Sequence, residues 1–96
     1  MDDKELYEQK KRAQLQEWQA EVDKLKAQAS RLSADAQLEL NKRIRNLEER
    51  IDHGKSRLAE FGQASGEAWD SIKDGVESAW DAIDSAFRDA ANAFRK

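Results

Sequence analysis

The sequence predicts an all-α fold, in which a long coiled-coil helix is followed by an antiparallel amphipathic helix that completes a helical hairpin. Three observations lead to this fold class. The 96 residues include no proline, four glycines and 39% charged residues, a composition that favours helix. Apolar residues before residue 61 recur with the alternating steps of three and four that define a heptad. After residue 66 they follow an eleven-residue repeat.

Residues 1–61 are predicted to form the long heptad helix. Two successive four-residue steps after Ala36 form a stutter, which unwinds a supercoil locally without breaking the helix. The pattern therefore predicts one continuous helix from about residue 3 to residue 61, roughly 90 Å long. A break near residues 30–35 is left open, because the serines and the aspartate there can cap a new helix.

Residues 62–66 are predicted to form a turn, and residues 67–95 the second helix, packed back on residues 33–61. Gly62 is expected to end the first helix in the left-handed conformation, and Ser65 to cap the next one. Small residues beside the large ones widen the apolar sector of the second helix to about half of its circumference.

Apolar residues from both helices form the predicted core of the hairpin. An antiparallel pairing centred on residues 63 and 64 places Trp80 opposite Leu47, and Gly54 beside Trp69 and Ile72. Gly54 either makes room for an aromatic ring or is simply tolerated, and the sequence does not decide between the two. The predicted hairpin core is Leu40, Ile44, Leu47, Ile51, Leu58, Trp69, Ile72, Val76, Trp80, Ile83 and Phe87.

The hairpin leaves the N-terminal half of the heptad seam without a partner, and an uncovered apolar stripe indicates association. Two long helices that cross antiparallel would place each N-terminal half against the hairpin of the other chain, which predicts a homodimer. The alternative is a monomeric three-helix bundle with a break near residue 33. We prefer the dimer, because the seam crosses residues 29–44 without losing phase. The predicted self-association seam is Leu15, Trp18, Val22, Leu25 and Leu32.

No catalytic, cofactor-binding or metal-ligating residue is predicted. His53 is the single histidine and cysteine is absent, so the chain has neither a histidine pair nor a thiolate. The acidic residues of the second helix lie along a straight helix, whereas calcium loops need a turning backbone. We therefore expect a protein that is not an enzyme and holds no cofactor.

The charge pattern argues against nucleic acid and, less strongly, against membranes. Residues 1–61 carry 13 acidic and 13 basic residues, so the net charge of -3 arises in residues 62–96. Basic residues such as Arg12 can pair with acidic ones one turn earlier, such as Glu8. No segment resembles a signal peptide or a membrane span, which predicts a soluble, cytoplasmic protein. The acidic polar face of the second helix disfavours anionic lipid.

Three strings resemble a group of small bacterial coiled-coil proteins of uncharacterised function. They are the string from Leu15 to Ala27, Ser65-Gly66-Glu67-Ala68-Trp69-Asp70, and Val76-Glu77-Ser78-Ala79-Trp80. The resemblance implies a bacterial helical protein and supplies no site residue. The last 30 residues are also similar in pattern to the eleven-residue repeats of apolipoproteins and desiccation-related proteins.

The predicted function is that of a non-enzymatic coiled-coil interaction or scaffold protein that self-associates, with an unknown second protein partner left open. The alternative is a peripheral lipid-surface or stress-protective protein that uses its C-terminal amphipathic helix.

Overall fold

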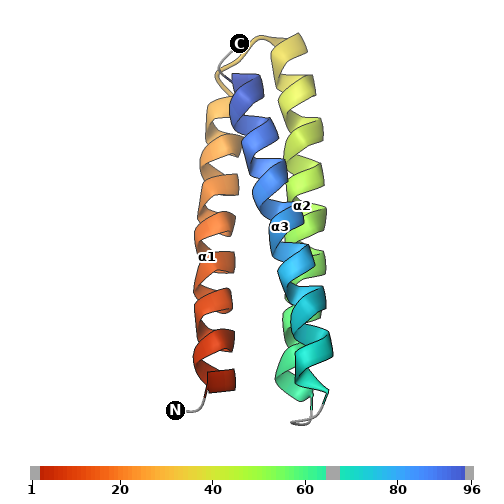
Figure 1. Cartoon of the computed structure of the whole chain (residues 1–96). Helices are drawn as coiled ribbons and strands as arrows, with labels where there is room; N and C mark the ends of the chain where they lie inside the picture. Colours follow the sequence, from red (N-terminus) through yellow and green to blue (C-terminus); the bar gives the residue numbers. More distant parts are fainter. Residues whose placement is uncertain (1–2, 65–67, 95–96) are drawn as a thin grey trace.

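The computed structural model describes residues 3–64 and 68–94, and these ranges form three α-helices and no strand. They are α1 (Asp3–Ala29), α2 (Ala34–Gln63) and α3 (Trp69–Phe94). The helices lie side by side along the long axis of a bundle that measures 51 × 20 × 18 Å (Figure 1). The turn between α1 and α2 lies at the end of the bundle where α3 ends (Figure 1). The predicted all-α class is confirmed.

The first helix ends at Ala29, and residues 30–33 reverse the chain. The prediction of one continuous helix from residue 3 to residue 61 is therefore wrong for the single chain, and the break left open near residues 30–35 is present. Arg31 N–H donates to Gln28 O and Leu32 N–H to Ala29 O, each at 3.1 Å, bonds that tighten the helix end. The reversal allows α1 to bury its apolar seam without a second chain.

The connection between α2 and α3 lies further along the chain than predicted, because α2 ends at Gln63 and α3 begins at Trp69. Gly62 does not end the helix, because α2 continues to Gln63 and no described residue has a positive φ. The chain leaves α2 through Ala64, whose extended ψ is 142° and whose N–H donates to Phe61 O at 3.2 Å. The predicted cap at Ser65 lies outside the described residues.

The core runs through all three helices and is built from aliphatic and aromatic side chains. No polar or charged residue is buried in the described part of the chain. All of the predicted hairpin core residues belong to this core: Trp69, Ile72 and Phe87 are partly buried and the others are buried. Burial of these side chains, each contributing about 1.5–3 kcal/mol, stabilises the bundle.

The register of α2 against α3 differs from the predicted one. A Cβ built on Gly54 would lie 3.0 Å from Ile83 Cδ1 and 3.2 Å from Trp80 Cζ3, so these side chains occupy the place predicted for Trp69 and Ile72. The predicted pairing was centred on residues 63 and 64, whereas α2 continues to Gln63 and α3 begins only at Trp69, so the pairing is displaced along the chain. Gly54 makes room for an aromatic ring, which is one of the two readings of this residue.

Alanine substitutions at two glycines separate helix propensity from packing. A Cβ at Gly75 would meet only Arg57 Cδ, at 3.9 Å, so Gly75→Ala should stabilise the protein by about 0.5–1 kcal/mol. Gly54→Ala gains the same propensity but must displace Ile83 and Trp80, which costs about 1–3 kcal/mol. In urea unfolding, the free energy of unfolding of Gly75→Ala should therefore exceed that of wild type, and that of Gly54→Ala should be lower than that of Gly75→Ala. Equal effects of the two substitutions would contradict the packing described for Gly54.

Truncation of Trp80 tests the centre of the core. The residue is 4% exposed, so Trp80→Ala should lower the free energy of unfolding by about 3–5 kcal/mol, because it removes a large side chain and leaves a cavity. Ser85→Ala, an exposed change on the same helix, is the control and should stay within about 0.5 kcal/mol of wild type. Denaturant unfolding followed by circular dichroism measures both. A small effect of Trp80→Ala would contradict the core.

Candidate interaction surface

The predicted self-association seam is divided between the inside of the chain and its surface. Leu15 and Val22 are buried, and Trp18 and Leu25 pack against the core in a partly buried state. Leu32, at the turn after α1, is 37% exposed. The first four residues thus contact the hairpin, as the sequence predicted, but they contact the hairpin of their own chain. In the single chain they are internal contacts rather than contacts between subunits.

Side chains, rather than close backbone approach, join α1 to α3. Among the described residues, no Cα atom of α1 lies within 8 Å of a Cα atom of α3, whereas α2 approaches both helices that closely. The space is filled by Trp18, whose ring centroid lies 5.8 Å from that of Trp80 and 6.2 Å from that of Phe87. Such pairs contribute about 0.5–1.5 kcal/mol each beyond the area that they bury.

A second aromatic group lies near the N-terminal end of α1. The Tyr7 ring centroid is 4.9 Å from that of Phe61, which in turn is 5.6 Å from that of Trp69. The Lys73 ammonium lies 5.0 Å from the Tyr7 centroid and 5.6 Å from the Trp69 centroid. Cation–π contacts of this kind contribute about 0.5–1 kcal/mol at exposed sites. All three helices therefore meet in this group.

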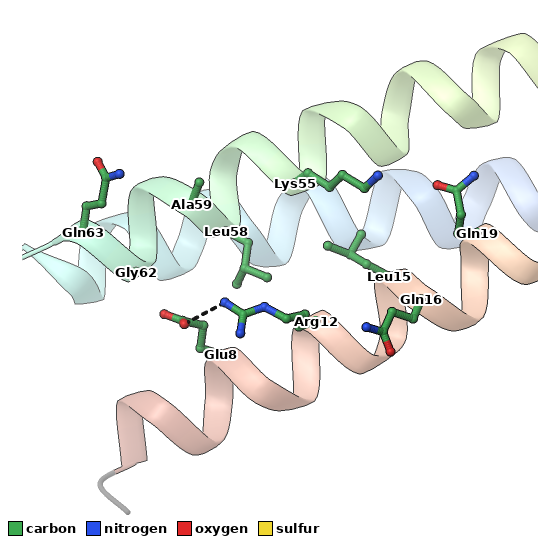
Figure 2. Close-up of a pocket in the computed structure, with 10 residues that line it drawn as sticks. All are labelled: Glu8, Arg12, Leu15, Gln16, Gln19, Lys55, Leu58, Ala59, Gly62 and Gln63. Atoms are coloured by element: carbon green, nitrogen blue, oxygen red, sulfur yellow. Dashed lines mark hydrogen bonds and ion pairs between the residues drawn. The ribbon is translucent and has the colours of Figure 1, made fainter.

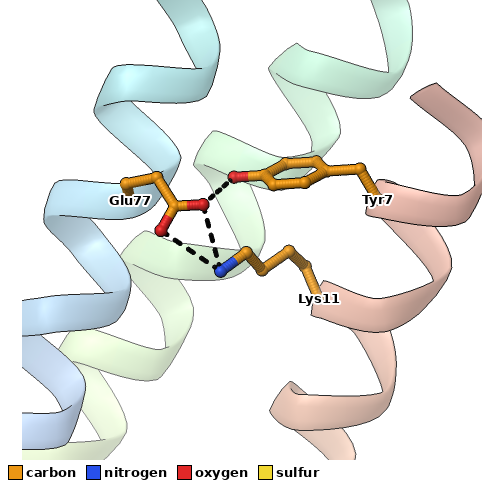
Figure 3. A network of polar contacts seen from close by, with 3 residues as sticks. All are labelled: Tyr7, Lys11 and Glu77. Atoms are coloured by element: carbon orange, nitrogen blue, oxygen red, sulfur yellow. Dashed lines mark hydrogen bonds and ion pairs between the residues drawn. The ribbon is translucent and has the colours of Figure 1, made fainter. Parts of the chain in front are cut away.

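One polar network crosses from α1 to α3 (Figure 3). The Tyr7 hydroxyl donates to Glu77 Oε1, and Lys11 Nζ lies 3.2 Å from Glu77 Oε1 and 3.3 Å from Oε2. Lys11 Nζ also lies 5.4 Å from the ring centroids of Tyr7 and Trp80. The Lys11 side chain is 11% exposed and that of Glu77 is 45% exposed, so the ion pair is shielded from solvent on the lysine side only.

The network shifts two pKa values. The hydrogen bond from Tyr7, followed by the bond and the charge of Lys11, holds the pKa of Glu77 below its ordinary value of 4.5, although partial burial opposes this shift. Burial, and then the bond to and charge of Glu77, raise the pKa of Tyr7 well above its ordinary value. The network favours a neutral tyrosine beside an ionised glutamate, which is the arrangement that joins α1 to α3.

Sequence reasoning did not find Tyr7, Lys11 and Glu77, because each lies outside the large apolar stripes. A signal for two of them was present: Tyr7, Lys11, Gln14 and Trp18 recur at steps of four, three and four on α1. Trp18 belongs to the heptad seam and Lys11 precedes it by seven residues, so this stripe continues the seam towards the N-terminus.

Two buried polar atoms flank the same interface. In the described part of the chain, Trp80 Nε1 and Gln14 Oε1 are buried without a hydrogen-bond partner. Each such atom costs about 1–3 kcal/mol of desolvation. The attachment of α1 therefore combines favourable aromatic contacts with an unfavourable polar contribution.

A groove of about 500 Å³ lies between α1 and α2 (Figure 2). Leu15 and Leu58 form its apolar floor, and Arg12 pairs with Glu8 at 3.0 Å on its rim. Each of the two leucines is only 5% exposed. Its remaining lining consists of Gln16, Gln19, Lys55, Ala59, Gly62 and Gln63.

His53 lies exposed on α2, at a shallow pocket of about 290 Å³. Asn46, Glu49 and Arg50 line the pocket beside it, together with Ala79 and Ala82. No hydroxyl, thiol or amine side chain is among the lining residues, so the pocket offers His53 no such group to activate. Within residues 3–64 and 68–94, no three or more histidine, cysteine or acidic residues gather in a way that could hold a metal ion.

Comparisons with known proteins leave the family open. No family model, curated protein or solved structure matches this chain. The resemblance to small bacterial coiled-coil proteins therefore stays a prediction. In the described ranges, no helix has the length and apolar character needed to cross a membrane.

The depressed pKa of Glu77 predicts how stability depends on pH. A carboxylate with a lowered pKa in the folded state contributes stability above its ordinary pKa, and this contribution is lost as the pH falls through the folded value. Glu77→Gln should therefore be less stable than wild type near neutral pH, and the difference should shrink at about pH 3. Urea unfolding at both pH values measures it. Asp81→Asn, an exposed change on the same helix, is the control, and a pH-independent deficit of Glu77→Gln would contradict the network.

Proposed function

We propose that this chain is a non-enzymatic helical interaction protein that self-associates. The features that support the proposal are the apolar and aromatic contacts that dominate the described residues and the scarcity of side chains with catalytic chemistry. The two groups with shifted pKa values are Tyr7 and Glu77, and their network joins two helices. His53 is exposed and lies far from Tyr7 in the sequence. Perturbed pKa values also occur in structural ion-pair networks.

The observation that carries the proposal is the course of the heptad seam. Its members Leu15, Trp18, Val22 and Leu25 are covered within the chain, but the seam leaves the bundle at the α1–α2 turn, where Leu32 is 37% exposed. An apolar seam that continues beyond its intramolecular partner supports contact with a second chain at this end of the bundle.

The position of α3 favours protein contacts over a lipid surface. Trp69, Trp80 and Phe87 face the core, and the aromatic face of α3 is occupied by α1 and α2. The outer face of α3 carries exposed carboxylates, including Asp70, Asp74 and Asp81. A lipid surface would have to displace α1 before it reached the aromatic side chains, and anionic headgroups would be repelled by the outer face.

Sedimentation equilibrium tests the proposal. Wild-type protein should show a mass that rises with concentration from 11.0 kDa towards twice that value. Leu32→Glu should weaken the association by about tenfold or more, because it places an unpaired charge in the contact. The substitution should leave the single chain folded, since Leu32 is exposed there.

Leu6→Glu is the matched control, because Leu6 is 51% exposed on α1 but lies outside the seam. It should associate as wild type does. A wild-type mass that stays at 11.0 kDa from micromolar to millimolar concentration would reject self-association.

A further inference from the structure

We infer that the chain self-associates by exchanging α1: residues 30–33 straighten into helix, and α1 packs on the α2–α3 hairpin of a second copy. This inference rests on the proposed function and specifies its partner and its hinge. The contacts that α1 makes within one chain would then be made between two chains. Exchange of an identical element between protomers is a low-cost route to a dimer.

The turn at residues 30–33 is close to helical. Ser30 N–H still donates to Lys26 O at 3.3 Å, which is the spacing of an α-helix. The φ of Ser33 is −61°, a helical value, and only its ψ of 159° departs from the helical value of about −42°. The Ser33 hydroxyl makes no capping bond to the described residues of α2. No glycine, proline or positive φ holds the chain in this reversal.

The apolar pattern fits a straightened hinge as well as a bent one. The steps from Ala29 to Leu32 to Ala36 to Leu40 are three, four and four residues, so a continuous helix keeps these side chains on one face. Leu32 and Ala36 are exposed in the single chain. At the middle of two crossing helices they would face the same residues of the second copy, which adds apolar contact that the single chain lacks.

The contacts described between α1 and the hairpin can all be transferred to a second copy. The rings of Trp18, Trp80 and Phe87 meet through side chains alone, and Lys26 Nζ pairs with Glu48 Oε2 at 3.3 Å. Among the described residues no Cα atom of α1 lies within 8 Å of α3, but α1 packs closely on α2, so this packing is broken and then remade on the α2 of the second copy. In a two-fold symmetric dimer, each hairpin binds the α1 of the other chain, so the assembly closes with two copies.

A proline at Ala34 separates the bent hinge from the straight one. Proline is favoured at the first position of a helix and requires an extended residue before it, as Ser33 is in the single chain. In a continuous helix the same proline removes a hydrogen bond and clashes with the preceding turn. Ala34→Pro should therefore keep the thermal midpoint of the single chain and weaken the dimer by about 10⁴-fold, since the dimer contains two hinges. Ala34→Ser, which fits both hinges, is the control and should associate as wild type does.

Cross-linking identifies which chain supplies α1. Light and ¹⁵N-labelled wild-type chains are unfolded together, refolded at high concentration and treated with a carbodiimide, which joins Lys26 to Glu48 without a spacer. We expect dimers in which linked peptides combine a light and a heavy chain. Dimers whose Lys26–Glu48 links lie only within one chain, or an Ala34→Pro variant that dimerises like wild type, would overturn the exchange and leave self-association standing. A wild type that stays monomeric would overturn both.

Discussion

The contact of the Trp80 ring with all three helices fixes the arrangement of the bundle. The ring lies against Gly54 of α2, beside Trp18 of α1 and under the ammonium of Lys11. A side chain at position 54 would push the ring away from α2, and the distance between α1 and α3 is set by the two indoles between them. The register of α2 against α3 and the position of α1 therefore both depend on how one tryptophan is accommodated.

This contact also explains why the helices are attached in two different ways. Small residues of α3, including Ala79, Ala86 and Ala90, are buried, which allows close approach to α2. On its other side α3 meets α1 through large rings and through the Tyr7–Glu77 bond. α1 also packs closely on α2, and only its contact with α3 depends on a few long side chains. In the exchange proposed above, the hairpin of α2 and α3 stays intact and α1 changes partners.

The sequence predicted which face of each helix is apolar. It predicted neither the register of α2 against α3 nor whether α1 packs on the hairpin of its own chain or of another chain. Periodicity shows which side of a helix is apolar, so Leu47, Ile51 and Ile83 were assigned to the core correctly. It does not fix where a connection begins and ends, and the predicted pairing of Trp80 with Leu47 was centred on residues 63 and 64, although α2 extends to Gln63. The Tyr7–Lys11–Glu77 network escaped prediction because it depends on the reach of long side chains across a gap between helices. No pattern within one helix encodes that distance.

The same limit explains why a heptad seam could not decide between a bent and a straight chain. Leu15, Trp18, Val22 and Leu25 make equivalent contacts whether the hairpin belongs to their own chain or to another, so these contacts cancel when the two states are compared. Only the differences remain. The single chain keeps the entropy of independent translation and holds its own α1 at a high effective concentration. The paired state covers Leu32 and Ala36 and gains helical hydrogen bonds at the hinge. The balance therefore rests on residues 30–36, a segment that contributes little to the core, and protein concentration shifts it by mass action.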